Sequence, residues 1–528
     1  MQRGRLSLRA VFAALAVVCG QFTGYAAEPA PPVDLVIINA RIFTADPARP
    51  WAESVAIRGT RIAAVGSRAE LGLLESTAKR VIDAGGRVVV PGINDAHVHE
   101  PSWTEPDNVA VPADASAEEL LAEVRAAAER LAAGTWLQGT VPVALVGSPK
   151  LTRDTVDAVA SRHPVCFQIG SGHAALLNTA ALRAWQIAEG DPNPAGGWYA
   201  RTAGRLNGWI YEHAYWRKAR DEAGRLSDER LVARMDEFAA RALRHGITSV
   251  QTMPMVDVAR LEPLLARLQM PLRWRLMQIQ MGTVEPTPRR PAKYILDGAP
   301  MERGAAVRSD YSDMPGHRGR ENYSDAQLAA IVATAARSEQ QVLLHIIGDR
   351  VLEKLFEVMA HHRVDWPAKR LRVEHGSFIG EFVPQAKRAG VILVQNPTHF
   401  GNPAVMLARF GAKRSEHFDV LRTALEAGIP VALGSDGPIN PWLNVALATT
   451  HPRNPREAVT REQAVAAYTR GSARAEFTER DKGTIAPGML ADLAMLSQDP
   501  FTVSLDDLPN TEAVLTVIGG TIAYELPR

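Results

Sequence analysis

Cysteine is nearly absent from this chain of 528 residues, which contains only two. One of them, Cys19, lies in an N-terminal stretch that we expect to be removed, so Cys166 would remain alone. A single cysteine cannot form a disulfide within the chain. The fold must therefore be held together by its apolar core, which a chain of this length is large enough to build.

Long apolar runs and an excess of charge of either sign are also missing. Lysine and arginine total 59, aspartate and glutamate total 58, and the formal net charge is +1. Hydrophobic residues make up 46% of the chain and charged residues 22%, which is typical of globular proteins rather than of disordered or multispanning ones. Nothing in this balance indicates a nucleic-acid partner, and we expect no stable membrane anchor.

The first 27 residues differ in kind from the rest. Arg3, Arg5 and Arg9 precede a short apolar stretch, and small residues follow it. This order is typical of a secretory signal peptide, and the apolar part is too short to cross a bilayer comfortably. We therefore expect residues 1–27 to be removed and the protein to be exported, periplasmic or secreted, with a net charge of −2 because this segment contains no acidic residue. A retained anchor and a lipidated Cys19 are the alternatives.

Two β-rich segments flank a middle of different character. Residues 33–91 and 478–528 have the pattern of short strands separated by glycine turns, without a long helix. We expect them to form one small β-sandwich domain built from both termini. Residues 92–477 alternate amphipathic helices with short apolar strands, which is typical of repeated βα units. The predicted fold class is α/β, a (β/α)8 TIM-like barrel with this small β-sandwich domain.

About eight strands are expected in the middle region, enough to close a barrel. We expect long helices near residues 117–133, 227–245 and 324–339. The predicted strands are one that ends near Asn94 and the apolar runs at residues 165–169, 248–252, 275–280, 342–346, 371–374, 391–395 and 431–434. Residues 304–322 are expected to form a long loop, and loops of that length are commonly functional.

Histidines and a carboxylate follow the ends of several predicted strands. His97 and His99 come directly after an apolar strand, and residues two apart on a strand point to the same side. His345 and His375 end two further apolar runs, and Asp436 follows another. The carboxyl ends of barrel strands form the active-site face, so we expect these side chains to meet at one divalent metal site. Taken singly, each residue has a structural role as its alternative.

The run from Pro91 to His99 resembles the first-strand metal motif of the amidohydrolase superfamily. Residues 482–493 resemble that superfamily's return into its sandwich domain. Between them the chain is similar to amidohydrolase family 3, the subgroup that includes N-substituted formamide deformylases. The elements that carry this similarity are residues 171–173 with Asn178, 204–208 with Glu212, 246–249, Lys293 with 297–298, 345–350, 374–376 and 434–436. The resemblance covers residues 33–524.

The resemblance implies a two-metal centre bridged by a carboxylated lysine, and Lys293 occupies the matching position. An unmodified lysine offers only a cation, whereas its carbamate is a carboxylate that can bridge two metals. The predicted metal ligands are His97, His99, Lys293, His345, His375 and Asp436. They would hold one or two divalent ions, with zinc first among the candidates and iron, manganese and nickel as alternatives. A mononuclear site would need only three histidines and Asp436, leaving Lys293 an ordinary lysine.

The expected reaction is hydrolysis of a non-peptide C–N bond, amide-like, in a small molecule. Water bound to the metal loses its proton near neutral pH, Asp436 is predicted to accept that proton, and the hydroxide attacks the carbonyl carbon. His173 is predicted to contact the substrate or the transition state, with a structural role as its alternative. In the family an acidic residue usually precedes the Gly-His pair, and this chain has Ser171 there, so we expect a different substrate preference.

Other functions remain as alternatives. A deaminase of the same superfamily is disfavoured because His345 is followed by Ile346, Ile347, Gly348 and Asp349 rather than by an early glutamate. Lactonase or dipeptidase activity fits the same chemistry, and a non-catalytic, metal-free relative is a further alternative. A serine hydrolase is excluded because no Gly-x-Ser-x-Gly turn connects a strand to a helix. The substrate and the oligomeric state, a homo-oligomer included, are left open.

Overall fold

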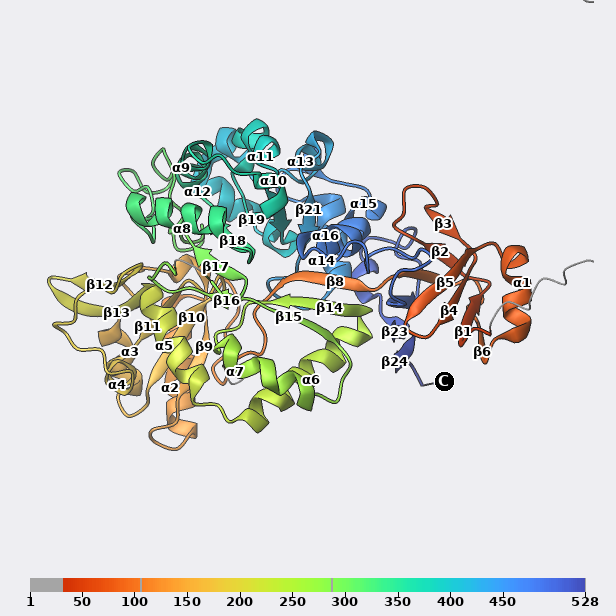
Figure 1. Cartoon of the computed structure of the whole chain (residues 1–528). Helices are drawn as coiled ribbons and strands as arrows, with labels where there is room; N and C mark the ends of the chain where they lie inside the picture. The colour runs from red at the N-terminus through yellow and green to blue at the C-terminus, as the bar shows by residue number, and fades with distance from the viewer. Residues whose placement is uncertain (1–31, 105–106, 286–287, 528) are drawn as a thin grey trace, which may run out of the picture.

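The computed structural model describes residues 32–104, 107–285 and 288–527. The predicted signal peptide lies outside these residues. In the described part of the chain, no helix has both the length and the apolar character needed to cross a membrane. The fold belongs to the α/β class, with helices packed on parallel and mixed sheets (Figure 1).

Parallel strands form the centre of the molecule. A three-stranded sheet contains β8 (Ile93–Val98), β14 (Ile247–Thr252) and β15 (Arg273–Leu276). After the single residue Met277, a six-stranded parallel sheet continues in chain order. Its strands are β16 (Gln278–Ile279), β17 (Ala292–Ile295), β18 (Val342–Ile346), β19 (Arg372–His375), β20 (Ile392–Gln395) and β21 (Val431–Leu433). These strands are almost entirely buried, as expected of a parallel sheet covered on both faces.

Amphipathic helices precede these strands and cover them. The helices that lead into β14, β18, β19, β20 and β21 are α6 (Asp228–Arg244), α8 (Asp325–Arg337), α9 (Asp349–Ala360), α11 (Val383–Ala389) and α13 (Leu421–Ala427). Ser227 and Ser324 cap the first two by accepting a hydrogen bond from a backbone N–H of the first turn, which satisfies one of the free donors there. The helices expected near residues 227–245 and 324–339 are thus confirmed. Their apolar faces and the strands share one large core cluster.

Closure of the parallel strands into a barrel stays a prediction, because the described ladders run from β8 to β15 and from β16 to β21. One backbone hydrogen bond, from Asp436 N to His97 O at 2.9 Å, connects the segment after β21 to β8.

One predicted strand was assigned to the wrong sheet. Residues 165–169 form β10 (Val165–Ile169), which pairs with β9 and β11 in a separate sheet. The parallel strand that the sequence pattern missed is β17, whose four residues are too few to show a periodicity.

That separate sheet lies at the end of the molecule opposite the chain termini (Figure 1). Its order is β12-β13-β11-β10-β9. Its other strands are β9 (Leu137–Val141), β11 (Ala174–Leu177), β12 (Gly197–Thr202) and β13 (Arg205–Glu212). The accompanying helices are α2 (Ala117–Arg130), α3 (Arg153–Ala160), α4 (Thr179–Ala184) and α5 (His213–Gly224). The region predicted as barrel alone, residues 92–477, therefore also contains a second sheet with its own core cluster.

Both ends of the chain contribute strands to one terminal sheet, of order β24-β23-β22-β7-β2-β3. These strands are β2 (Arg41–Phe43), β3 (Trp51–Ala52), β7 (Val88–Pro91), β22 (Leu493–Leu496), β23 (Ala513–Ile518) and β24 (Thr521–Glu525). A four-stranded sheet accompanies it with helix α1 (Arg68–Thr77), and its strands are β1 (Leu35–Ile38), β4 (Ser54–Arg58), β5 (Arg61–Gly66) and β6 (Arg80–Asp83). Ile37 and Ile57 of one sheet share a core cluster with Val89 and Leu493 of the other. The classification of this unit as a sandwich stays a prediction.

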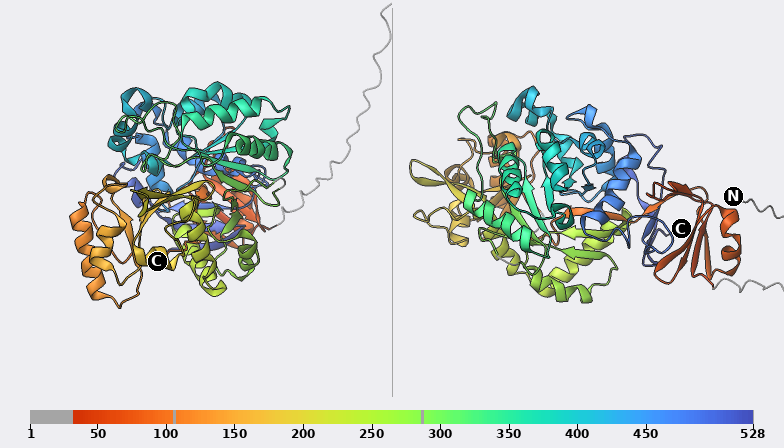
Figure 2. Two further views of the ribbon diagram at one scale, coloured as in Figure 1. Left: turned by 90° about the vertical axis from the view of Figure 1, so that its left-hand side faces the viewer. Right: turned by 45° about the horizontal axis from the view of Figure 1, so that its top comes forward.

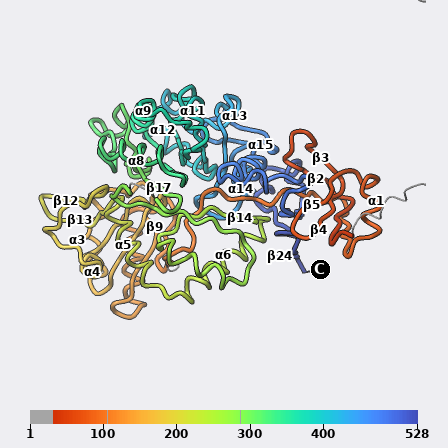
Figure 3. Tube along the Cα trace, in the orientation of Figure 1, coloured from red at the N-terminus to blue at the C-terminus, as the bar shows by residue number. Residues whose placement is uncertain are grey.

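The path of the chain places the last strand beside the N-terminal sheets, as the tube in Figure 3 and the turned views in Figure 2 show. The pairing of β7 with β22 is antiparallel and joins residues about four hundred positions apart. The remaining helices are α7 (Val258–Leu261), α10 (Trp366–Lys369), α12 (Pro403–Ser415), α14 (Pro441–Thr450), α15 (Arg461–Ala466) and α16 (Ser472–Ala475).

One ion pair fastens the terminal sheet to the central strands. Asp492, directly before β22, accepts hydrogen bonds from Arg273 Nε at 2.8 Å and Nη2 at 3.0 Å, and from Gly519 N at 2.8 Å. The Asp492 side chain is only 3% exposed. A two-point contact between guanidinium and carboxylate is strong and geometrically specific, and losing one partner leaves the other uncompensated.

Replacing Asp492 with Ala is therefore expected to destabilise the protein by about 2–3 kcal/mol, because three hydrogen bonds to a buried carboxylate are lost. Chemical denaturation followed by tryptophan fluorescence measures the change. Asp481→Ala is the matched control, since its pair with Arg61 is half exposed on both sides and is expected to contribute less than about 1 kcal/mol. Equal unfolding midpoints for the two variants would contradict this account.

Candidate metal centre

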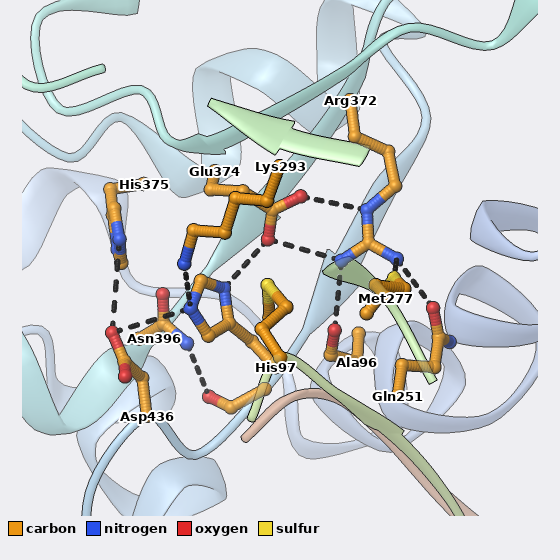
Figure 4. Close-up of polar contacts among 12 residues, drawn as sticks. Ala96, His97, Gln251, Met277, Lys293, Arg372, Glu374, His375, Asn396 and Asp436 are labelled. Atoms are coloured by element: carbon orange, nitrogen blue, oxygen red, sulfur yellow. Dashed lines mark hydrogen bonds and ion pairs between the residues drawn. The ribbon is translucent and has the colours of Figure 1, made fainter. Parts of the chain in front are cut away.

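Imidazoles from two strand ends surround one carboxylate. His97 on β8 and His99 just after it place their Nε2 atoms 3.6 Å and 3.4 Å from the carboxylate oxygens of Asp436. His375, the last residue of β19, places Nε2 3.7 Å from the same carboxylate. In Figure 4, dashed lines join both His97 and His375 to Asp436. These predicted ligands, which lie far apart in the sequence, are therefore brought together.

The hydrogen bonds of His97 and His99 determine which ring nitrogen of each faces the Asp436 carboxylate. His97 Nδ1 lies 2.6 Å from Glu374 Oε2, and His99 Nδ1 lies 2.7 Å from Met253 O. Both partners are acceptors, so in a neutral imidazole Nδ1 carries the proton and Nε2 carries the lone pair. Two lone pairs then face a carboxylate across 3.4–3.6 Å, an arrangement that a bound cation would stabilise; Lys293 Nζ, 3.0 Å from His97 Nε2, hydrogen-bonds only the first of them. The donor set thus fits a divalent metal ion.

Other polar atoms of the site support the same fit. Within the described residues, His345 Nε2 and His375 Nδ1 are buried without a hydrogen-bond partner. The ring of His345 lies 4.6 Å from that of His375, between centroids. Buried polar groups normally have a partner, so the unpaired Nε2 of His345, whose ring lies against that of His375, fits a site that would hold a further ligand. His345 therefore lies close enough to belong to the centre, although its Nε2 is not in the tight group around Asp436.

Lys293 lies inside the same centre. Its Nζ is 3.0 Å from His97 Nε2, and the residue is 1% exposed (Figure 4). Among the described residues, no carboxylate lies within ion-pair distance of this nitrogen. Burial lowers the pKa of Lys293 to about 8, despite the opposing charges of Asp436 and Glu374. A buried lysine without an ion-pair partner is unusual, and it loses its proton more easily than a surface lysine does.

A buried charge network positions His97. Arg372 donates to both oxygens of Glu374, at 2.7 Å and 3.0 Å, and also to Ala96 O at 2.8 Å. Arg372 and Glu374 are both fully buried. Burial acts to raise the pKa of Glu374, but Arg372 and His97 hold that pKa well below its ordinary value. Glu374 is therefore a carboxylate, and a carboxylate on the far nitrogen orients a metal-binding imidazole and increases its basicity.

The backbone at this site is unusual at two of the predicted ligands. His375 has φ 64° and Asp436 has φ 39°, both in the left-handed region that non-glycine residues rarely adopt. Burial acts to raise the pKa of Asp436, but His97, His99 and His399 hold it well below its ordinary value. A strained backbone at two neighbouring functional groups is typical of an active site.

His399 was not predicted from the sequence. It lies in the short helix at Pro397–Gly401 that follows β20, with Nε2 3.7 Å from Asp436 Oδ2 and its ring stacked on His375 at 5.4 Å between centroids. Its side chain is 45% exposed, so it lies on the solvent side of the centre. The sequence signal was weak because His399 is four residues past the strand rather than at its end.

A second polar cluster adjoins the first. His173 Nδ1 contacts both oxygens of Glu212, at 3.1 Å and 3.0 Å, and Asn322 Nδ2 donates to Glu212 at 3.0 Å. Glu302 completes a group whose polar atoms lie within 4.8 Å of one another. The ring of His173 lies 4.8 Å from that of His345, between centroids, so the second cluster touches the metal centre. Of this cluster the sequence predicted only His173 as a functional residue, and it quoted Glu212 as a motif residue.

Glu302 comes from the segment that follows β17. Asp297 holds this segment in place, because its buried carboxylate accepts backbone hydrogen bonds from Ala306 at 2.9 Å, Ile347 at 3.0 Å and Gly348 at 2.8 Å. These bonds fasten the segment to the end of β18. The long loop expected at residues 304–322 therefore follows a turn that is anchored to the central strands.

Comparisons with known proteins agree with this chemistry. Residues 80–524 match the model of the Amidohydrolase family. The N-substituted formamide deformylase of Arthrobacter pascens is 26% identical over 534 residues, which cover 93% of this chain and 98% of that protein. The structure of an uncharacterized metal-dependent hydrolase from Pyrococcus horikoshii is similar with a TM-score of 0.68 and 20% identity, covering 89% of this chain and 99% of that one. The zinc complex of atrazine chlorohydrolase from Arthrobacter aurescens has a TM-score of 0.52 and 15% identity, covering 93% and 95%.

Glu374→Gln is expected to weaken divalent metal binding about tenfold or more, because the amide no longer enforces the Nδ1–H tautomer of His97. Competition with a chelator, followed by elemental analysis, measures the affinity. Glu426→Gln on the exposed face of α13 is the control and should bind metal like the wild type. Unchanged affinity in a folded Glu374→Gln protein would show that this contact does not support a metal ligand.

Proposed function

Because the chain belongs to the amidohydrolase family, whose members are hydrolases that act on carbon–nitrogen bonds, we propose that it cleaves a non-peptide, amide-like C–N bond in a small molecule with the help of a divalent metal. The observation that carries the proposal is the set of imidazole Nε2 atoms 3.4–3.7 Å from the Asp436 carboxylate. The proposal includes an exported location, a closed (β/α)8 barrel and a terminal β-sandwich.

The proposed ligands are His97, His99, Lys293, His345, His375 and Asp436. Zinc is the first candidate, since the structurally similar atrazine chlorohydrolase was solved as a zinc complex and imidazole with carboxylate suits that ion. When bound, such a metal supplies a water whose proton is lost near neutral pH and an electrophile for the substrate oxygen. Proton transfer and stabilisation of the developing charge are proposed for side chains of the protein itself.

Asp436 is proposed to handle the proton. Its carboxylate has a pKa well below the ordinary value, so it is ionised at neutral pH and can accept a proton from water and return it to the leaving nitrogen. The surrounding imidazoles restrict its position, so the transfer needs no reorganisation. His399 lies on the open side of this carboxylate, where an incoming substrate would pass.

His173 is proposed to stabilise the negative charge that develops on the carbonyl oxygen. Burial favours the neutral ring, but Glu212 raises the pKa of His173 to about 9, so the imidazole is cationic at neutral pH. A fixed cationic donor next to the reacting carbonyl favours the tetrahedral transition state over the planar ground state. Its ring lies against His345, at the edge of the metal centre.

Lys293 is proposed to carry a carbamate. The neutral amine attacks carbon dioxide, an N–C bond forms, and one proton is released to solvent. Support comes from burial without an ion-pair partner, from the 3.0 Å approach of Nζ to His97 Nε2, and from a pKa near 8 that leaves part of the amine neutral. The product is an anionic oxygen donor, whereas an ammonium group there would repel a metal ion.

Substrate candidates are N-substituted formamides, on which the similar deformylase is named to act, and other N-acyl amines. Deamination is the alternative reaction. It is disfavoured because the Asp349 carboxylate accepts hydrogen bonds from Arg308 N at 2.8 Å and Arg308 Nε at 3.1 Å rather than facing the centre.

Metal-loaded protein is tested against formamides, N-acyl amines, lactones, dipeptides and aromatic amidines. Turnover of an N-acyl amine is the expected result, and ammonia release from amidines alone would favour the deaminase. A folded chain that takes up no zinc would be the non-catalytic relative.

Asp436→Asn is expected to lower turnover of the best substrate by about 100-fold or more while the protein remains folded, because an amide cannot accept the proton from water. Steady-state kinetics at equal metal content measures the change. Asp506→Asn, which removes an exposed carboxylate far along the chain, serves as the control. Unchanged turnover in Asp436→Asn with full metal content would remove Asp436 from the proton path.

Lys293→Ala is expected to lose both metal and activity, and added acetate or propionate should restore part of each, because a free carboxylate can occupy the space of the missing carbamate. Wild-type protein equilibrated with isotopically labelled bicarbonate should show a carbamate carbon signal by nuclear magnetic resonance. Lys293→Ala with wild-type metal content and no response to carboxylates would leave the lysine without a ligand role.

A further inference from the structure

Ser171 stands here where the family usually has an acidic residue before the Gly-His pair. A carboxylate from another part of the chain nevertheless lies next to Ser171. Ser171 Oγ donates a hydrogen bond to Glu302 Oε2 at 3.0 Å. Glu302 belongs to the segment after β17, more than one hundred residues away. The negative charge that is absent at position 171 is therefore present at the same place, supplied by another part of the chain.

Space for the Glu302 carboxylate is provided by two glycines. A Cβ atom at Gly298 would lie 3.1 Å from Glu302 Oε1 and 2.4 Å from Glu212 Oε1, and a Cβ atom at Gly304 would lie 2.8 Å from Glu302 Oε1. Ala299 N donates to Glu302 Oε1 at 2.5 Å. The Glu302 side chain is thus held by the backbone of its own turn and by Ser171. Residues larger than glycine at positions 298 and 304 would disturb this conformation.

The charge of Glu302 has no cationic partner among the lysines and arginines of the described residues. Its two donors, the Ser171 hydroxyl and the Ala299 amide, are neutral. The imidazole of His173, which belongs to the same cluster, is already bound through Nδ1 by both oxygens of Glu212. When both carboxylates are ionised, one negative charge is uncompensated, and burial raises the pKa of Glu302 to about 7, so a cation bound there would stabilise the ionised form.

Glu302 also retains the capacity to bind something further. A carboxylate accepts about four hydrogen bonds, and two donors are in place. Glu302 is partly exposed, whereas Glu212 is fully buried, so Glu302 is the more accessible of the two carboxylates. The His173 ring connects the cluster to His345 and hence to the metal centre. A group bound to Glu302 would belong to the same molecule as the bond that is cleaved.

We propose that Glu302 is a specificity-determining residue that binds a protonated amine, or a guanidinium, of the substrate, so that the preferred substrate is a cationic N-acyl amine. This inference rests on the proposed function and deepens it. Charge-assisted hydrogen bonds to a carboxylate are roughly twice as strong as neutral ones, and the uncompensated charge of Glu302 provides the electrostatic preference.

The test compares three substrates with the same five-methylene spacer, which differ only at the end remote from the amide. These are N-acetyl-1,5-diaminopentane, N-hexylacetamide and N-acetyl-6-aminohexanoate, which end in an ammonium, a methyl and a carboxylate group. The series is repeated with shorter and longer spacers and as formamides. Metal-loaded wild-type enzyme is expected to hydrolyse the ammonium compounds with a kcat/KM about tenfold or more above that of the neutral ones, mainly through KM.

Glu302→Gln is expected to remove this preference, so that the ratio of kcat/KM for the ammonium compound to that for the neutral compound falls to about one. The double variant Ser171→Asp/Glu302→Ser returns the carboxylate to the position usual in the family and should restore the preference. Ser171→Ala keeps the Glu302 charge and should keep the preference. Asp310→Asn, an exposed carboxylate of the same segment that pairs with Arg318, is the control for surface charge.

The outcomes separate this inference from the proposed function. Hydrolysis of N-acyl amines without a preference for cations, or with a preference for neutral or anionic ends, would overturn the role of Glu302. A preference that persists in folded Glu302→Gln would overturn it as well. If Glu302→Gln changed all substrates equally through kcat, the residue would position His173 rather than bind substrate. Absence of turnover for every N-acyl amine with metal bound would instead contradict the proposed function itself.

Discussion

Two imidazole lone pairs and a carboxylate oxygen that face each other closely repel one another, and a divalent cation between them removes this repulsion. His97 and His99 present Nε2 to Asp436 across 3.4–3.6 Å, and their Nδ1 atoms are committed to acceptors elsewhere. The low dielectric of the interior makes this repulsion costly and makes its relief by a divalent ion correspondingly favourable. The surrounding structure holds the ligands in this arrangement in advance, so the binding energy of the ion is not spent on moving them.

The support of the site comes from side chains that are not themselves proposed metal ligands. Arg372 and Glu374 lie on the same strand, two residues apart, and together fix the ring of His97 on β8. Asp297 fastens the segment that carries Glu302 to the end of β18. The strands β8, β18 and β19 thus deliver His97, His345 and His375 at or near their carboxyl ends, and neighbouring side chains hold these groups in place.

The sequence predicted those features whose pattern lies within a short stretch of the chain. Histidines placed directly after apolar runs predicted the centre around Asp436, and amphipathic periodicity predicted the long helices. Periodicity could not tell which sheet a strand joins, so residues 165–169 were placed among the central strands although they pair with β9 and β11. His399 and Glu302 were missed for a related reason: their roles depend on where a loop folds back, and contacts between distant segments leave no local pattern.

The most direct measurement is anomalous X-ray diffraction from crystals of the mature chain loaded with zinc, recorded on both sides of the zinc absorption edge. The account predicts a strong anomalous peak within coordination distance of His97 Nε2, His99 Nε2 and the Asp436 carboxylate. A fully folded protein whose anomalous density is absent from this position, or lies only at surface residues, would contradict it.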